Sequence, residues 1–163
     1  MSLETVDHIV DFIFRHTPQH ETIDIGFFGG EPLLEFDLIQ AIVQRIHRHD
    51  AYDASRMLYS LVTNGTIFSE TIAAGLRRHR IALGISCDGP AHAQNSSRVF
   101  PDGTGSSAIV ENTIRQALGH FPFLPVNAVY TPQTVDFLPD IVDYFYGLGV
   151  RNIYLNPDIS ARW

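Results

Sequence analysis

Three short segments of the chain combine small residues with side chains that can donate or accept hydrogen bonds. They are Gly29-Gly30-Glu31-Pro32, Thr63-Asn64-Gly65-Thr66 and Ser86-Cys87-Asp88-Gly89-Pro90. Successive glycines let a ligand approach the backbone, and Glu31 adds a carboxylate beside them. The same composition suits a tight turn that Pro32 stiffens, and for Gly29-Gly30 taken alone the turn is the simpler interpretation.

Each segment follows a predicted strand, because apolar residues alternate between strand and helix spacing along the chain. The expected strands are 23–27, 58–62, 81–86, 126–130 and 151–155, and the expected helices include 6–13, 38–46, 72–76, 110–118 and 138–148. Asp37, Ser69 and Thr134 are placed to cap helices, and Gly149 suits a helix C-terminus. Residues 89–106 are expected to form a polar loop.

Strands separated by single helices imply parallel pairing through right-handed crossovers. The predicted fold class is therefore α/β, with about five parallel strands and flanking helices, as an open doubly wound sheet or part of a barrel. A closed eight-stranded barrel needs about 250 residues, and this chain has 163. Ligands bind at the carboxyl ends of strands in both architectures.

The third predicted strand can be interpreted either as part of a ligand site or as purely structural. Ala82, Gly84, Ser86 and Asp88 share one face, which is nearly bare until its last two residues. Such a face leaves room for a ligand, but close backbone packing at the centre of a sheet explains it equally well.

Composition excludes several classes of protein. The charge of −7, from 11 Lys+Arg against 18 Asp+Glu, discourages binding to nucleic acid or to an anionic membrane. No apolar run approaches the roughly 20 residues of a membrane span. A single cysteine, Cys87, forms no internal disulfide and suggests a reducing cytoplasm. The basic run Arg77-Arg78-His79-Arg80 ends a predicted helix. Cations interact favourably with the helix dipole there, and this interpretation is preferred over an anion-binding patch.

Taken together, these segments resemble those of radical S-adenosylmethionine (radical SAM) enzymes. Phe27-Phe28-Gly29-Gly30-Glu31-Pro32-Leu33-Leu34 resembles their Gly-Gly-Glu-Pro segment, and Leu61-Val62-Thr63-Asn64-Gly65-Thr66 resembles the strand that follows. Ile85-Ser86-Cys87-Asp88-Gly89-Pro90, with His92 and Arg98, is similar to the Ser-x-Asp-Gly segment of one branch. That branch holds the anaerobic sulfatase-maturating enzymes and related SPASM-type peptide maturases. The resemblance runs from about Ile23 to Asp158.

The resemblance implies a partial (β/α)6 TIM-like barrel that binds S-adenosylmethionine. Gly29-Gly30-Glu31 should then meet the α-amino group, Ser86 should hydrogen-bond the cofactor, and Arg98 should pair with its carboxylate. Leu155 should approach the adenine, whereas Asn64 and Asp88 either contact the cofactor or only hold their loops.

One part of the family pattern is missing. Its [4Fe–4S] cluster is held by Cys-x3-Cys-x2-Cys, and Cys87 alone cannot replace three thiolates. No metal ligand or catalytic residue is therefore assigned. We expect residues 1–163 to be a single domain, the central part of the core barrel, without the first strand, its cluster loop and the C-terminal auxiliary domain.

The resemblance implies that the parent enzyme cleaves S-adenosylmethionine reductively at a [4Fe–4S] cluster. The radical formed would abstract hydrogen from a peptide or protein substrate, whereas this fragment alone would be inactive. Its truncated sheet edge would favour self-association.

The alternative is a nucleotide-binding or ligand-binding α/β domain without radical chemistry. Gly103-Thr104-Gly105-Ser106-Ser107-Ala108 fits a dinucleotide fingerprint, which requires a strand directly before it. A loop-like stretch precedes it instead, so a turn with a helix N-cap at Ser106 or Ser107 is preferred.

The eight histidines raise the question of a metal hydrolase. Pro18 separates His16 from His20, and His47 and His49 lie on different faces of their helix. Most of the histidines are therefore expected at the surface.

Overall fold

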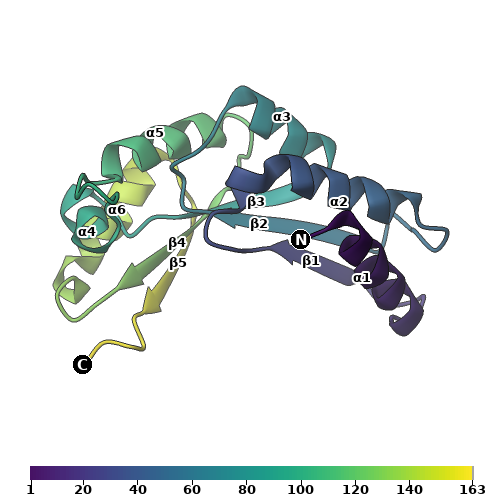
Figure 1. The fold of residues 1–163 in the computed structure, drawn as a ribbon. Coiled ribbons are helices and arrows are strands. Elements are labelled where there is room, and N and C mark those ends of the chain that lie inside the picture. The colour runs from purple at the N-terminus through teal and green to yellow at the C-terminus, as the bar shows by residue number, and fades with distance from the viewer. Residues whose placement is uncertain (163) are drawn as a thin grey trace. The chain divides into compact units, whose positions relative to one another are not determined.

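The computed structural model describes residues 1–162, in which helices and strands alternate (Figure 1). The elements are α1 (Leu3–His16), β1 (Ile23–Phe27), η1 (Pro32–Glu35), α2 (Phe36–Arg48), β2 (Met57–Thr63), α3 (Glu70–Arg78), β3 (Ile81–Ser86), α4 (Ala91–Ser97), α5 (Ser107–Leu118), β4 (Pro125–Tyr130), η2 (Val135–Phe137), α6 (Leu138–Leu148) and β5 (Asn152–Pro157).

The five strands form one sheet in the order β1-β2-β3-β4-β5. β1 pairs with β2, and β4 pairs with both β3 and β5, in parallel throughout. The expected α/β class with five parallel strands is confirmed. β1 and β5 are the edge strands of this sheet.

Contacts group the chain into two compact units. The first contains residues Met1–Leu61 and Glu70–Ala82, and the second contains Val62–Ser69 and the chain from Leu83 onward. Each unit has its own buried apolar residues.

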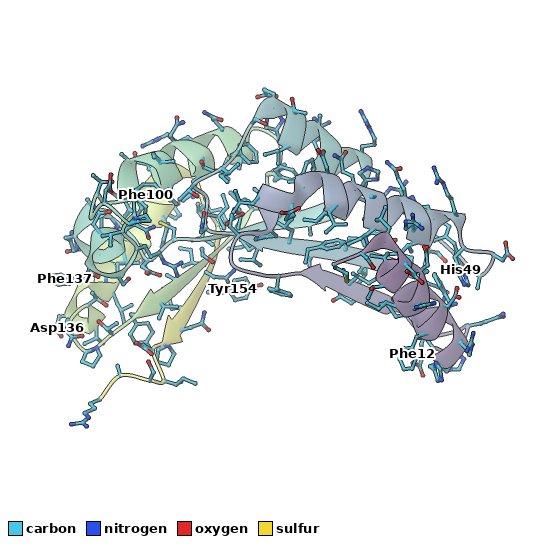
Figure 2. The ribbon with its side chains drawn as sticks, viewed as in Figure 1. Phe12, His49, Phe100, Asp136, Phe137 and Tyr154 are labelled. Atoms are coloured by element: carbon cyan, nitrogen blue, oxygen red, sulfur yellow. The ribbon has the colours of Figure 1, made fainter. Side chains whose placement is uncertain are left out.

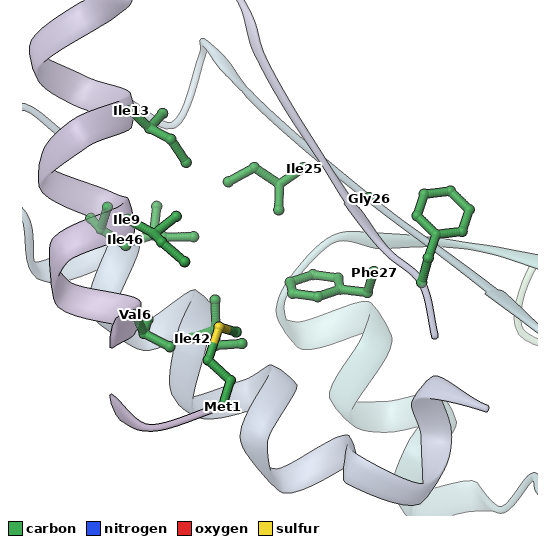
Figure 3. Close-up of a pocket in the computed structure, with 11 residues that line it drawn as sticks. Met1, Val6, Ile9, Ile13, Ile25, Gly26, Phe27, Ile42 and Ile46 are labelled. Carbon is green, nitrogen blue, oxygen red and sulfur yellow. The ribbon is translucent and has the colours of Figure 1, made fainter. Parts of the chain in front are cut away.

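In the first unit, α1 and α2 place their apolar faces against each other and against β1. Ile39, Val43 and Ile46 of α2 are buried, as are Val6 and Val10 of α1. Figure 3 shows side chains from α1, α2 and β1 around an apolar cavity of about 240 Å³. At the surface, Arg45 of α2 forms an ion pair with Asp7 of α1.

In the second unit, α5 and α6 supply the largest share of the core. Phe145 and Ile141 of α6 are buried, and so are Val110 and Ile114 of α5. The inward-facing residues of β3 and β4 are buried as well: Leu83, Ile85, Val126 and Ala128. Burial alternates along β4, whereas on β3 Gly84 of the other face is buried as well.

The expected loop at 89–106 is partly wrong, because it contains the helix α4 (Ala91–Ser97). Its buried residues are Ala93 and Gln94, so it lacks the large apolar residues that mark a helix in sequence. Hydrogen bonds from Gln94, described below, hold the helix in place.

Two expected caps are also wrong. α2 begins at Phe36, directly after the 3-10 turn η1, so Asp37 lies inside the helix, where it accepts a hydrogen bond from Gln40. Thr134 precedes η2 rather than α6, and its hydroxyl accepts from the backbone N–H of Thr131. In both cases a 3-10 turn runs into the α-helix, which moves the helix start away from the capping residue.

The described part of the chain, residues 1–162, contains no helix that is both long and apolar enough to cross a membrane.

The C-terminus of α6 gives a matched test of backbone strain. Gly149 has a φ of 97° and ends α6 in the left-handed conformation, as expected, whereas Gly147 is a helical residue with no atom near an added Cβ. We expect Gly149→Ala to lower the free energy of unfolding by about 1 kcal/mol. Gly147→Ala should raise it by about 0.5 kcal/mol. Denaturant titrations of both variants measure the difference, and equal effects would contradict it.

Candidate functional site

The second unit contains an ion pair at the end of β3. Asp88, whose side chain is 6 % exposed, accepts two hydrogen bonds from Arg98. Arg98 Nε lies 2.7 Å from Oδ2, and Nη2 lies 3.0 Å from Oδ1. Oδ1 also accepts from the backbone N–H of Val129 at 2.9 Å, and Oδ2 accepts from the Ser97 hydroxyl at 3.2 Å. The carboxylate therefore joins the end of β3 to the end of α4 and to β4.

This pair bears on the predicted role of Arg98 as the partner of a cofactor carboxylate. Two of its nitrogens already bind Asp88, and its side chain is 30 % exposed. A guanidinium carries five N–H groups, so a bidentate pair leaves further donors. Asp88 fixes the direction of this side chain, and its bond to the N–H of Val129 ties the end of β3 to β4.

Gln94 supports the pair from α4. It is fully buried, and its Oε1 accepts from the backbone N–H of Asp88 at 2.7 Å. Its Nε2 lies 2.9 Å from the Ser106 hydroxyl, which in turn donates to the backbone oxygen of Arg98 at 2.7 Å. Sequence analysis missed Gln94, because a glutamine in a polar stretch carries no signal of burial.

The neighbouring residue Asn95 explains the glycine-rich motif before α5. Its amide binds both the backbone N–H and the hydroxyl of Ser107, each at 3.0 Å. A Cβ on Gly105 would lie 2.2 Å from Asn95, and Gly103 has a φ of 84°. Packing and a turn therefore account for both glycines. The preference for a turn over a dinucleotide fingerprint is confirmed.

Ser86 and Cys87 end β3 with opposite properties. Ser86 is half-buried, and its hydroxyl has no hydrogen-bond partner among residues 1–162. Cys87 is 1 % exposed, and burial raises the pKa of its thiol to about 11. Since iron–sulfur clusters require several thiolates, the described residues do not fit a [4Fe–4S] cluster. They contain no group of three potential metal ligands either.

In the first unit, Gly29 and Gly30 are exposed, and an added Cβ at either would meet no atom within 4 Å. Neither has a positive φ. The expected turn therefore does not require glycine here. Glu31 follows, and its Oε1 accepts from the backbone N–H of Leu33 at 3.0 Å, capping η1.

The last two predicted site residues lie in the second unit. Asn64 holds its own turn, because its Oδ1 accepts from the Thr66 N–H at 2.9 Å and from the Thr66 hydroxyl at 2.7 Å. Leu155 lies on β5 opposite Ala128 and is 37 % exposed. Within this unit the structure brings Asp88 and Arg98 into direct contact and places Ser86 two residues before Asp88.

Removal of a member of the Asp88–Arg98 ion pair should strongly destabilise the chain. Asp88→Ala leaves the guanidinium of Arg98 and the N–H of Val129 without their acceptor, so the free energy of unfolding should fall by about 3 kcal/mol. Arg98→Ala should also cost about 3 kcal/mol, because it leaves the carboxylate of Asp88, whose side chain is 6 % exposed, without its counter-charge. A double-mutant cycle by denaturant titration measures the coupling. Asp102→Ala, at an exposed carboxylate, is the control, and an equal loss there would contradict the prediction.

Comparison with known proteins gives the family. Residues 2–108 match the family model described as a 4Fe-4S single cluster domain. The chain is 30 % identical over 154 residues to an uncharacterized protein of Methanocaldococcus jannaschii, covering 94 % of this chain and 51 % of that protein. It is 25 % identical to the radical SAM cyclopropyl synthase TigE of Paramaledivibacter caminithermalis, and the match covers 99 % of this chain and 33 % of that enzyme.

A sulfatase-maturating enzyme is similar in sequence, and a solved structure is similar in fold. The chain is 25 % identical to a cysteine-type anaerobic sulfatase-maturating enzyme of Clostridium perfringens, covering 87 % of this chain and 38 % of that enzyme. A solved structure described as native anSMEcpe with bound AdoMet has a TM-score of 0.85 at 22 % identity. The match covers 96 % of this chain and 42 % of that one. The chain thus spans about half or less of the length of these relatives. It belongs to the 4Fe-4S single cluster domain family, and its relatives include a radical SAM cyclopropyl synthase and an anaerobic sulfatase-maturating enzyme.

Proposed function

We propose that this chain is the S-adenosylmethionine-binding core of a longer radical SAM enzyme. The observation that carries the proposal is the pair of glycines after β1, which neither backbone conformation nor packing requires. A residue that the fold does not need to be glycine is explained when a ligand approaches its backbone.

In the second unit, Ser86 and Arg98 are proposed to bind the cofactor. The Ser86 hydroxyl, which lacks a partner in the described chain, would donate to it or accept from it. The donors of Arg98 outside its pair with Asp88 would bind the cofactor carboxylate. Asp88 is then a positioning residue that holds the guanidinium in one orientation.

In the first unit, the backbone oxygens of Gly29 and Gly30 and the carboxylate of Glu31 are proposed to bind the α-amino group. An ammonium group carries three donors and needs several acceptors.

In the second unit, Leu155 would contact the adenine. Asn64 contributes by holding its turn, since its side-chain oxygen already accepts two hydrogen bonds there.

When bound, S-adenosylmethionine would supply the radical chemistry, as the source of a 5′-deoxyadenosyl group that takes hydrogen from a substrate. Because the described residues do not fit an iron–sulfur cluster, no step of that chemistry is assigned to them. These residues would bind and orient the cofactor.

The proposed substrate is a peptide or protein. Support comes from relatives named as sulfatase-maturating enzymes and from a solved neighbour described with a bound peptide. The proposed setting is a reducing cytoplasm, which is supported by the single buried cysteine. Residues 1–163 as the central part of the core barrel, and self-association through a sheet edge, remain proposals of the same kind.

A second candidate is a ligand-binding α/β domain without radical chemistry. It is favoured by one observation, the single cysteine, whose burial raises its pKa to about 11.

Cofactor binding tests the glycine segment directly. We expect Gly30→Ala to weaken S-adenosylmethionine binding about ten-fold or more, because the added methyl group occupies the path of the ligand. The stability of this variant should match that of the original chain. Gly147→Ala, which also adds a methyl group in open space, is the matched control and should leave binding unchanged. Calorimetric titration of both variants gives the affinities, and equal affinities would overturn the role of Gly30.

The radical chemistry is tested on the full-length protein purified without oxygen. We expect iron and sulfide together with release of 5′-deoxyadenosine after reduction by dithionite. Ser86→Ala should retain the iron content but bind S-adenosylmethionine about five-fold more weakly, since one hydrogen bond is lost. Cofactor binding without iron or deoxyadenosine, after reconstitution, would support the ligand-binding candidate instead.

A further inference from the structure

A polar cavity of about 230 Å³ lies in the first unit, away from the segments considered so far. It lies at the amino ends of two strands, because Met57 begins β2 and Arg80 directly precedes β3. The proposed cofactor residues, in contrast, lie toward or beyond the carboxyl ends of their strands. This cavity is therefore a separate feature of the chain.

Two buried polar atoms beside the cavity have no hydrogen-bond partner within residues 1–162. They are the hydroxyl oxygen of Tyr59 and Nε2 of His79, and both residues line the cavity. The side chains are deeply buried, with Tyr59 5 % and His79 7 % exposed. Unpaired buried polar atoms are rare in folded proteins, and each calls for a specific explanation. His79 is thus an exception to the expectation that most of the histidines lie at the surface.

The charged side chains around the cavity are all cationic. Arg78 and Arg80 line it, and no aspartate or glutamate does. Within residues 1–162 neither guanidinium forms an ion pair or a side-chain hydrogen bond. Arg80 has a φ of 55°, and it is the single non-glycine residue of the described chain with a positive φ. Such strain is concentrated at functional sites.

Two histidines add hydrogen-bond donors beside these arginines. Burial and the neighbouring Arg78 lower the pKa of His79, and burial and His79 lower the pKa of His47. Both rings are thus neutral near pH 7, and each then carries one N–H donor. The ring of His47 lies 4.6 Å from Tyr52, 6.0 Å from Tyr59 and 6.3 Å from His79, measured between centroids.

The nearby His49, in contrast, has both a carboxylate partner and a ring partner within this unit. It lies just beyond the C-terminal end of α2 (Figure 2), 3.3 Å from the carboxylate of Asp11, and its ring stacks on Phe14. The cavity offers His47 and His79 no such carboxylate. His47 is exposed to water, whereas the buried Nε2 of His79 and hydroxyl of Tyr59 are left for a molecule that enters the cavity.

We propose that this cavity binds a phosphoryl group, either as inorganic phosphate or as part of a small phosphomonoester. A phosphate has acceptor oxygens in a tetrahedral array, which matches donors that come from three separate segments around the cavity. Arginine binds phosphate with two parallel hydrogen bonds, so Arg78 and Arg80 are the main contacts. Tyr59 and His79 would then donate to the same group.

The basic run in the sequence thus has two parts. Arg77 and Arg78 lie in the last turn of α3, as expected for contact with the helix dipole. Arg78 and Arg80 also line the cavity, but Arg77 does not. Arg77 therefore serves as a control of the same charge in the same run.

The test is titration of the chain with inorganic phosphate at constant ionic strength, followed by calorimetry. We expect saturable binding that Arg78→Gln and Arg80→Gln each weaken about ten-fold, while Arg77→Gln changes it less than about two-fold. Histidine ring signals in NMR spectra should show the pKa of His79 rising when phosphate binds, because an anion stabilises the charged ring. Parallel titration with adenosine 5′-monophosphate separates the sources, since tighter binding of the nucleotide identifies a phosphomonoester.

Any other pattern overturns the proposal. Absence of saturable binding would mean that the cavity holds only water, and equal weakening by all three arginine variants would mean that general attraction to the basic run explains the effect. All three arginines are exposed, so the variants should keep the fold, which denaturant titration checks. Binding of S-adenosylmethionine involves other residues and should be unchanged in each variant.

Discussion

The carboxylate of Asp88 is buried at the end of β3, and a charge in that position has to be surrounded by donors. Arg98 and Ser97 at the end of α4 supply them together with Val129 of β4. A single carboxylate therefore fixes where α4 ends and which backbone it faces. Gln94 adds a second tie to the same strand end, so that the segment between β3 and α5 has few alternative arrangements.

This arrangement separates two groups of residues. One set of residues is committed to structure, since its hydrogen bonds are made within the chain. The other set, Ser86 and the glycines after β1, has little structural work to do and leaves its groups open to a ligand. Sites that are held rigid before a ligand arrives lose less entropy on binding.

Sequence predicted the fold well, because apolar periodicity reports burial directly. It failed where burial is polar: α4 is anchored by Gln94, and His79 is buried beside Arg78, and neither pattern differs from a solvated stretch. The residues of the candidate site were found from their order along the chain and their family resemblance. The pairing of Asp88 with Arg98 was not, because sequence order does not show which charges meet. The start of α2 was misplaced for a local reason, since a 3-10 turn and a capped helix begin with similar residues.

The burial of Cys87 has a practical consequence. Its sulfur is closed off by the end of β3, and its one hydrogen bond is to the backbone oxygen of Gly89. A thiol in this state neither crosslinks two copies of the chain nor reacts readily with peroxide. Air therefore leaves this sulfur unchanged, and any oxygen sensitivity of the full-length protein would report on groups other than Cys87.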